Sequence, residues 1–202
     1  MNIPYDPYYT ANSLLERNPL SLTRNRLLSR VTAPSTEPVT LAEAKLYLRV
    51  DNTNEDTLIT DLITAARMLA ESWLGRSLIS QTWKIAFDTA IPFQLGLPMG
   101  PVVSVASVVI VNQDSSTVTV DSSTYWLNAA KNALVLNSAL SGFRIEITYN
   151  TGYGDATAVP KPVKQGLLAH IASMYDARGD TSDATLPEQV MGLYGPYREV
   201  RL

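Results

Sequence analysis

Residues 55–74 of the chain read EDTLITDLITAARMLAESWL, and Gly75 follows them. Apolar residues recur here at every third or fourth position, which is the period of an amphipathic α-helix. They are Leu58, Ile59, Leu62, Ile63, Ala66, Leu69, Ala70, Trp73 and Leu74. A glycine directly after the last apolar residue is a common helix end. The stretch therefore predicts a helix over about 55–74, roughly 30 Å long, with a broad buried face.

A shorter helix is predicted just before it. Thr40 and Glu43 have the spacing of a capping box, in which each side chain binds the backbone amide of the other residue. The pattern predicts a helix over about 41–49, and its apolar residues to be buried are Leu41, Ala44, Leu46 and Leu48. A polar break follows, and Asn54 is expected to cap the long helix.

A third helix is predicted near the C-terminal end of the chain. Pro160 and Pro162 suit a first helical turn, where a missing amide costs little. One apolar face follows, made of Val163, Leu167, Leu168, Ile171, Met174 and Tyr175. We expect this helix to pack with the two earlier ones.

The residues between the helices have the pattern of β-structure. Large apolar residues alternate from Trp83 to Phe87, and 102–111 is rich in valine. Further short strands are predicted near 117–121, 124–128, 133–136 and 143–149, and the polar run 112–116 is typical of a hairpin turn. Several short strands separated by turns predict an antiparallel sheet or a small sandwich.

The predicted fold class is therefore α+β. About three main helices form a small bundle over 39–78 and 159–180, and an inserted β unit over 79–158 projects from one end. Residues 1–38 contain five prolines and are interpreted as an N-terminal arm that orders on a partner, with a short amphipathic helix near 21–30. Residues 181–202 are interpreted as a C-terminal docking arm, because they are aromatic but too few to build a core of their own.

Composition excludes several classes of protein. A net charge of −3 does not favour a protein whose main role is to bind nucleic acid, since phosphate binding needs clustered Lys and Arg. No cysteine is present, which rules out disulfides and thiolate chemistry. No apolar run approaches the length of a membrane span, and the N-terminus has no signal-peptide pattern. These features favour a protein that folds in a reducing cytoplasm and has no membrane partner.

No catalytic, cofactor-binding or metal-binding constellation emerges from the motifs. His170 is the only histidine, and it lies within a predicted helix beside the apolar face. The polar run 51–56 lacks the Gly and Glu of a calcium loop. Gly152 and Gly154 have no lysine placed for a phosphate loop and are better explained by a tight turn. We therefore expect a structural protein and not an enzyme.

The order of the motifs resembles that of the head–tail connector (adaptor, or head completion) proteins of tailed bacteriophages. The resemblance covers about 37–178. Its motifs are Pro38-Val39-Thr40-Leu41-Ala42-Glu43-Ala44-Lys45 with Leu48-Arg49-Val50-Asp51, Ala65-Ala66-Arg67, Glu71-x-Trp73-x-Gly75-Arg76, Gln81-Thr82-Trp83, Leu97-Pro98-x-Gly100-Pro101-Val102, and Tyr149-x-x-Gly152-Tyr153-Gly154. The ending Leu193-x-x-Pro196-Tyr197-Arg198 is also similar to that of the family, whereas the long N-terminal arm departs from it.

The resemblance implies a structural virion protein at the head–tail interface. Such adaptors form a homo-oligomeric ring of twelve copies beneath the portal, extend the DNA channel and present a platform for a stopper or tail-completion protein. Double-stranded DNA is then expected to pass through the lumen without sequence-specific binding, and an acidic chain suits that role because it repels DNA.

The C-terminal end is the predicted portal-docking site. It is aromatic, and no partner for it within the chain is evident from the sequence. Its candidate contacts are Leu193, Tyr194, Tyr197, Arg198, Val200, Arg201 and Leu202. Deleting 186–202 is expected to abolish portal binding and to leave the fold intact. The alternative is a tail that packs on its own subunit.

Three other interpretations remain open at this point. One is a different virion ring, either a stopper or a tail-completion protein. Another is a carbohydrate-binding β module that uses Trp83, Tyr125 and Trp126 as a platform. The third is an enzyme centred on His170.

Overall fold

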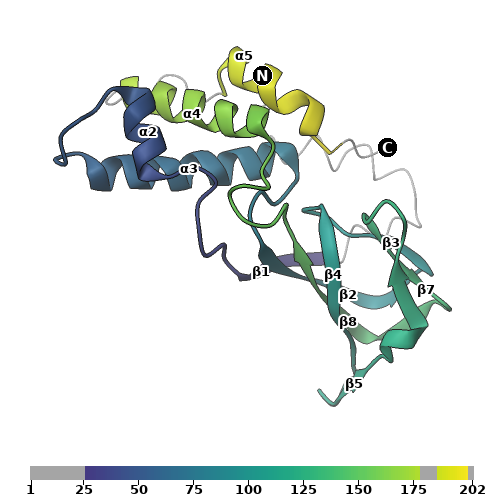
Figure 1. Cartoon of the computed structure of the whole chain (residues 1–202). Helices are drawn as coiled ribbons and strands as arrows, with labels where there is room; N and C mark the ends of the chain where they lie inside the picture. The colour runs from purple at the N-terminus through teal and green to yellow at the C-terminus, as the bar shows by residue number, and fades with distance from the viewer. Residues whose placement is uncertain (1–25, 178–185, 200–202) are drawn as a thin grey trace, which may run out of the picture.

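A computed structural model describes residues 26–177 and 186–199 of the chain. Within these residues four α-helices pack together, and antiparallel strands form a second unit that projects from one end of the helices (Figure 1). The helices are α2 (Leu41–Leu48), α3 (Asp56–Leu74), α4 (Lys161–Asp176) and α5 (Glu188–Tyr194). The predicted α+β fold is confirmed, with one helix more than the three that were expected.

The helix boundaries predicted at Thr40 and at Gly75 have the expected chemistry, and Pro162 lies in the first turn of α4 as predicted. The Glu43 amide donates to the Thr40 hydroxyl at 3.2 Å, and the Thr40 amide donates to the Glu43 carboxylate at 2.7 Å, which completes the capping box. Gly75 ends α3 in the left-handed conformation, at a φ of 67°. The prediction that Asn54 caps α3 is wrong. The helix starts after Glu55 without a side-chain cap, because Asn52 organises the preceding turn by accepting from the Asn54 amide.

The helical unit buries less apolar surface than the sequence pattern predicts. Ile59, Ile63, Ala66, Ala70 and Leu74 form the buried side of α3, together with residues of α2, α4 and α5. Three leucines that were predicted to be buried are exposed instead, with exposed fractions of 82% for Leu46, 37% for Leu58 and 48% for Leu69. Neighbouring helices cover only one side of α3, so the apolar residues on its other sides are exposed to solvent in the single chain.

The β unit consists of two antiparallel sheets around a second core. The strand order is β1-β2-β8-β4-β5 in the larger sheet and β3-β7-β6 in the smaller one. Their bounds are β1 (Arg26–Thr32), β2 (Gln81–Ile91), β3 (Gln94–Gly96), β4 (Val102–Val111), β5 (Thr117–Thr119), β6 (Tyr125–Leu127), β7 (Ala133–Leu136) and β8 (Leu140–Thr151). Ile85, Ile147 and Tyr149 of the larger sheet share this core with Leu134 and Leu136 of the smaller one. The structure is thus a small sandwich, one of the two predicted forms.

The predicted hairpin between β4 and β5 is present. Its turn is closed by the Asn112 amide, which donates to the Ser116 carbonyl at 2.9 Å. Val111 pairs with Thr117 directly beside the turn. The polar run 112–116 therefore forms the turn that its composition indicates.

Residues 26–32 differ from the prediction. The sequence assigned them to an arm with a short helix near 21–30, but from Arg26 onward they form the edge strand β1, in which Leu28 lies opposite Ile85 of β2. The paired residues are fifty or more positions apart in the sequence, so the local pattern alone gives no sign of the pairing. Of the rest of the predicted arm, 33–38 belong to the connection between β1 and α2, and 1–25 lie outside the described residues.

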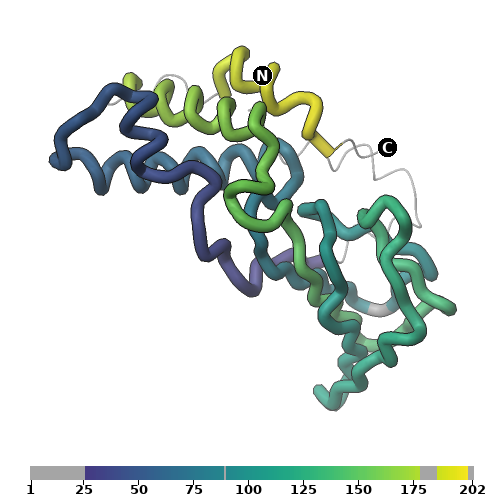
Figure 2. The backbone as a smooth tube through the Cα atoms, in the orientation of Figure 1, coloured from purple at the N-terminus to yellow at the C-terminus, as the bar shows by residue number. Residues whose placement is uncertain are grey.

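The chain passes repeatedly between the two units, as the backbone trace shows (Figure 2). It leaves the β unit after β1 to form α2 and α3, returns as β2, and leaves again after β8 to form α4. The helical unit is therefore assembled from segments on both sides of the inserted strands.

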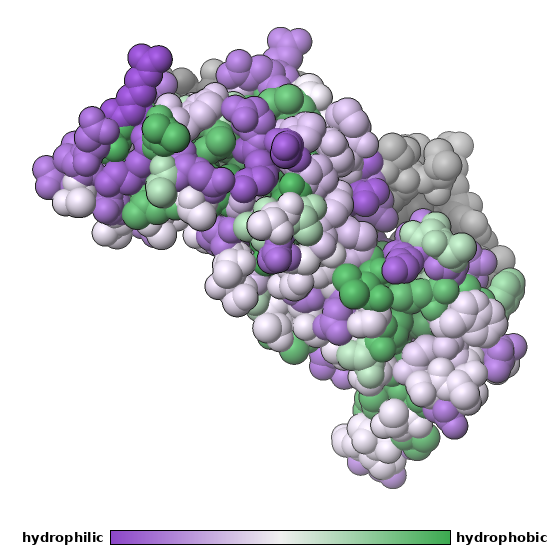
Figure 3. Space-filling model, viewed as in Figure 1, coloured by the Kyte–Doolittle hydropathy of each residue, from purple (hydrophilic) through white to green (hydrophobic). Residues whose placement is uncertain are grey.

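The surface reflects this division. The helical unit is mostly hydrophilic in the view of Figure 3, with separate hydrophobic residues, and a larger hydrophobic area covers the β unit near β4. Val103 of β4 is 55% exposed. Within the described ranges, no helix combines the length and the apolarity that a membrane crossing requires.

Candidate functional site

The C-terminal segment, the predicted docking site, is held against its own chain. Helix α5 lies on α4 (Figure 1), and both Val190 and Tyr194 are fully buried. The ring of Tyr194 lies over Gly166 of α4, where a Cβ atom would come within 2.5 Å of the Tyr194 Cε1 atom. Only glycine leaves room for the tyrosine ring at this position.

The segment beyond α5 continues along the end of α3. Residues Gly195–Tyr197 form a short 3-10 helix, η3. The Arg198 guanidinium then lies over the ring of Trp73, 4.7 Å from its centroid, and the Glu199 amide donates to the Leu74 carbonyl at 2.9 Å. The premise that this end has no partner within the chain is therefore wrong, because its apolar side chains complete the core of the helical unit.

Four of the seven predicted docking residues are described by the structure, and they differ in burial. Tyr194 is buried, Leu193 and Tyr197 are half-buried, and Arg198 is exposed. The other three, Val200, Arg201 and Leu202, lie outside the described residues. Because Val190 and Tyr194 belong to the core, deletion of the whole segment 186–202 would damage the fold and is not a clean test of docking.

Tyr194 and His170 are titratable residues that lie buried in the helical unit. Burial raises the pKa of the Tyr194 hydroxyl and lowers the pKa of the His170 imidazole. Neither the Tyr194 hydroxyl nor the His170 Nδ1 atom has a hydrogen-bond partner in the described part of the chain. His170 is 4% exposed, so its environment is that of a core histidine. Among the described residues, no group of three His, Asp or Glu side chains could hold a metal ion.

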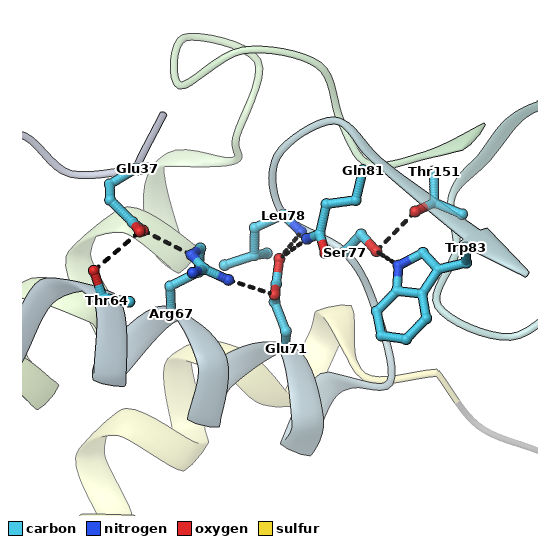
Figure 4. Close-up of polar contacts among 9 residues, drawn as sticks. All are labelled: Glu37, Thr64, Arg67, Glu71, Ser77, Leu78, Gln81, Trp83 and Thr151. Atoms are coloured by element: carbon cyan, nitrogen blue, oxygen red, sulfur yellow. Dashed lines mark hydrogen bonds and ion pairs between the residues drawn. The ribbon is translucent and has the colours of Figure 1, made fainter. Parts of the chain in front are cut away.

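A polar network, missed by the sequence analysis, lies where the helical and β units meet (Figure 4). Glu71 on the buried side of α3 accepts from the Arg67 guanidinium at 3.0 Å, from the Leu78 amide at 2.8 Å and from the Gln81 side-chain amide at 2.5 Å. Arg67 also donates to Glu37 at 2.7 Å. Burial raises the pKa of the Glu71 carboxyl, against the opposing effect of the Leu78 amide and the Arg67 guanidinium.

A second branch of the junction reaches the larger sheet. The Thr151 hydroxyl of β8 donates to the Ser77 hydroxyl at 2.8 Å, and the indole of Trp83 in β2 donates to the same Ser77 oxygen at 3.1 Å. Buried polar groups with several partners fix the geometry of the elements that carry them. The junction thus sets how the helices and the sheet lie relative to each other. The signal for this network in the sequence is the pair Arg67 and Glu71, two opposite charges four positions apart on the apolar side of the long helix.

The three aromatic residues of the carbohydrate-binding alternative do not form one platform. Trp83 belongs to the junction, and Tyr125 packs against the core of the β unit. Trp126 is 50% exposed on β6, and adjacent residues of a strand point to opposite faces.

Comparisons with known proteins agree with this geometry. In solved structures, the chain is similar to a protein in the neck of an empty gene transfer agent particle, computed with C6 symmetry, at 24% identity and a TM-score of 0.75. It is also similar to a protein in the virion of the native particle, at 25% identity and a TM-score of 0.74. A protein in the native neck, computed with C12 symmetry, is similar at 25% identity and a TM-score of 0.73. Each match covers 87% of this chain and 97% of the other.

No curated protein matches the chain. The model of the phage gp6-like head-tail connector proteins matches residues 38–193. This range includes α2 to α4, α5 without its last residue, and all strands except β1. The chain belongs to the family of phage gp6-like head-tail connector proteins.

Proposed function

We propose that this connector protein is a head–tail adaptor. Copies of the chain form a ring beneath the portal, extend the channel through which DNA leaves the capsid, and carry the stopper or the tail on their far side. The family to which the chain belongs is one of structural virion connectors, so the head–tail interface is its location.

The observation that carries the proposal is the likeness over 87% of the chain to a neck protein in a particle computed with C12 symmetry. A ring of twelve copies is the assembly that this symmetry supports. The two-unit architecture suits such a ring, because a cyclic assembly needs two different contact surfaces on each subunit.

We further propose that the C-terminal end contacts the portal. Tyr194 acts from inside the subunit, where its buried ring anchors α5 and so positions the residues after this helix. Leu193, Tyr197 and Arg198 are the described residues that present surface there, and Val200, Arg201 and Leu202 continue from them. Arginine next to aromatic side chains is the composition of energetically dominant interface residues.

The test is native mass spectrometry of the full-length chain, alone and mixed with its portal ring. We expect the portal to take up about twelve copies of the wild-type chain, in line with the C12 symmetry of the related neck. An Arg198→Glu variant is expected to bind more weakly, because the change reverses an exposed charge. The change also removes the contact of Arg198 with Trp73, so circular dichroism must show that the variant is folded. Lys131→Glu is the matched control, since Lys131 is also exposed but lies in the β unit.

A chain that ignores the portal would refute the adaptor assignment and favour a stopper or a tail-completion ring. Portal binding that is equally strong for Arg198→Glu, Lys131→Glu and the wild type would retain the adaptor assignment but remove the C-terminal end as its docking site.

A further inference from the structure

Helices α2 and α3 each expose apolar side chains that their own subunit does not use. The α2 patch consists of Leu46, 82% exposed, and Tyr47, 43% exposed. The α3 patch consists of Leu58, Met68 and Leu69, at 37%, 49% and 48%. Single exposed apolar residues are common, but two groups on adjacent helices of a mostly hydrophilic unit indicate an interaction surface.

The contacts of α3 show how the two patches are oriented. Lys45 of α2 pairs with Asp56, two positions before Leu58. Glu37, on the connection that leads into α2, pairs with Arg67, two positions before Leu69. Two residues of an α-helix turn through about 200°.

The chain segment that carries α2 therefore lies on one side of α3, and Leu58 and Leu69 lie on the opposite side. Leu58 and Leu69 share one face, because the eleven positions between them amount to about three full turns. On α2, Leu46 follows the buried Ala44 by two positions and therefore faces away from the core. The α2 patch and the α3 patch thus face in different directions, as the two surfaces of a head-to-tail ring contact must.

The charges beside the two patches are opposite. Arg49 is exposed at the end of α2, three positions after Leu46, and Asp61 is exposed on α3, three positions after Leu58. Neither residue forms a salt bridge with another described residue. A positive group next to one patch and a negative group next to the other would steer the two surfaces together and set their register.

We propose that the α2 patch of one copy packs on the α3 patch of the next copy, with Arg49 of the first copy facing Asp61 of the second. The occupant of each patch is thus a second copy of this chain. This inference rests on the proposed ring and specifies which surfaces close it. The contact leaves the β unit and the C-terminal end of each copy available for other proteins of the virion.

Cysteine cross-linking tests the pairing directly, because the natural chain has no cysteine and therefore no background. The test chain carries Leu46→Cys together with Leu69→Cys. A disulfide needs Cα atoms within roughly 7 Å, so two cysteines on opposite sides of the α2–α3 layer are not expected to bridge within one copy. Mild oxidation of the concentrated chain is expected to give a ladder of covalent dimers, trimers and larger species on a denaturing gel.

The single variants define the polarity of the contact. Leu46→Cys alone and Leu69→Cys alone are expected to stay monomeric, and an equal mixture of the two is expected to stop at a dimer that contains one of each. The matched control is Phe93→Cys with Val118→Cys, two similarly exposed residues of the β unit, at 63% and 53%. Circular dichroism checks that each variant is folded.

A ladder no stronger than that of the control pair would overturn the proposal, as would dimers formed equally well by each single variant alone. The outcome is separable from that of the adaptor assignment. If the wild-type chain assembles on the portal but the double variant gives no ladder there, the pairing is wrong and the adaptor assignment stands. If the wild-type chain ignores the portal but the double variant still forms its ladder, the pairing stands without the adaptor.

Discussion

Replacement of Glu71 by Gln should destabilise the protein far more than its small chemical change implies. The Glu71 side chain is 4% exposed and accepts from three donors: Arg67, the Leu78 amide and Gln81. Oε1 serves Leu78 and Gln81, and Oε2 serves Arg67. A glutamine keeps only one accepting oxygen, so in either orientation its NH2 group faces at least one donor.

The expected loss depends on which groups remain unpaired. Removing one member of a buried ion pair costs about 3–5 kcal/mol. Arg67 keeps its bond to Glu37 at 2.7 Å, which places the Glu71→Gln variant at the lower end, near about 3 kcal/mol. Glu146→Gln is the matched control, because Glu146 pairs with Lys84 at 2.9 Å in a partly exposed position. Such a pair contributes only about 0–1 kcal/mol.

Urea unfolding followed by circular dichroism measures both variants, and the free energies of unfolding come from linear extrapolation. The slope of the free energy of unfolding against urea concentration should be unchanged, since the surface exposed on unfolding is the same. A loss for Glu71→Gln as small as that for Glu146→Gln would contradict the reasoning. It would mean that Glu71 is already neutral in the folded protein, so that glutamine reproduces its state.

Two further predictions concern the helical core. Tyr194→Phe should leave the free energy of unfolding nearly unchanged, because the buried hydroxyl has no hydrogen-bond partner among the described residues. Tyr194→Ala should instead cost about 3–5 kcal/mol, as other large-to-small aromatic changes do. Chemical unfolding of the two variants side by side measures the difference, and equal losses would contradict the prediction. His170 should make stability depend on pH, because burial lowers the pKa of its imidazole in the folded state. Below about pH 6.5 the unfolded state therefore binds a proton at His170 that the folded state does not yet bind. Its contribution to stability is complete above that pH and is lost as the pH falls. A His170→Gln variant should lose this part of the pH dependence in unfolding measured from about pH 7.5 down to about pH 5, and identical profiles for the two chains would exclude His170 as the cause.

The sequence predicted those elements whose signals are local. Thr40 and Glu43 identify the start of α2, Gly75 ends α3, and the run 112–116 forms its turn, because each of these depends on residues only a few positions apart. The strand β1 could not be found in this way. Its partner β2 begins at Gln81, and the apolar residues of 26–32 are compatible with either a strand or a helix until that partner is known.

The candidate site was predicted only in part. The aromatic composition of the C-terminal end pointed to a contact, but the sequence does not say whether the contact is with a partner or with the chain itself. Tyr194 is buried over Gly166, and this depends on how α5 packs on α4. The overestimate of burial at Leu46, Leu58 and Leu69 has the same origin. Periodicity shows that a face is apolar, and only the tertiary structure shows how much of that face the single chain covers.

The repeated passage of the chain between its two units has a mechanical consequence. Three covalent connections, 33–40, 75–80 and 152–160, join the helices to the sheets. A force that separates the units is shared among three backbone segments in parallel instead of being carried by one linker. The helical unit and the β unit should therefore respond to load as a single stiff body, so that tension or torque applied to one end of the subunit reaches the other end without being absorbed by a hinge.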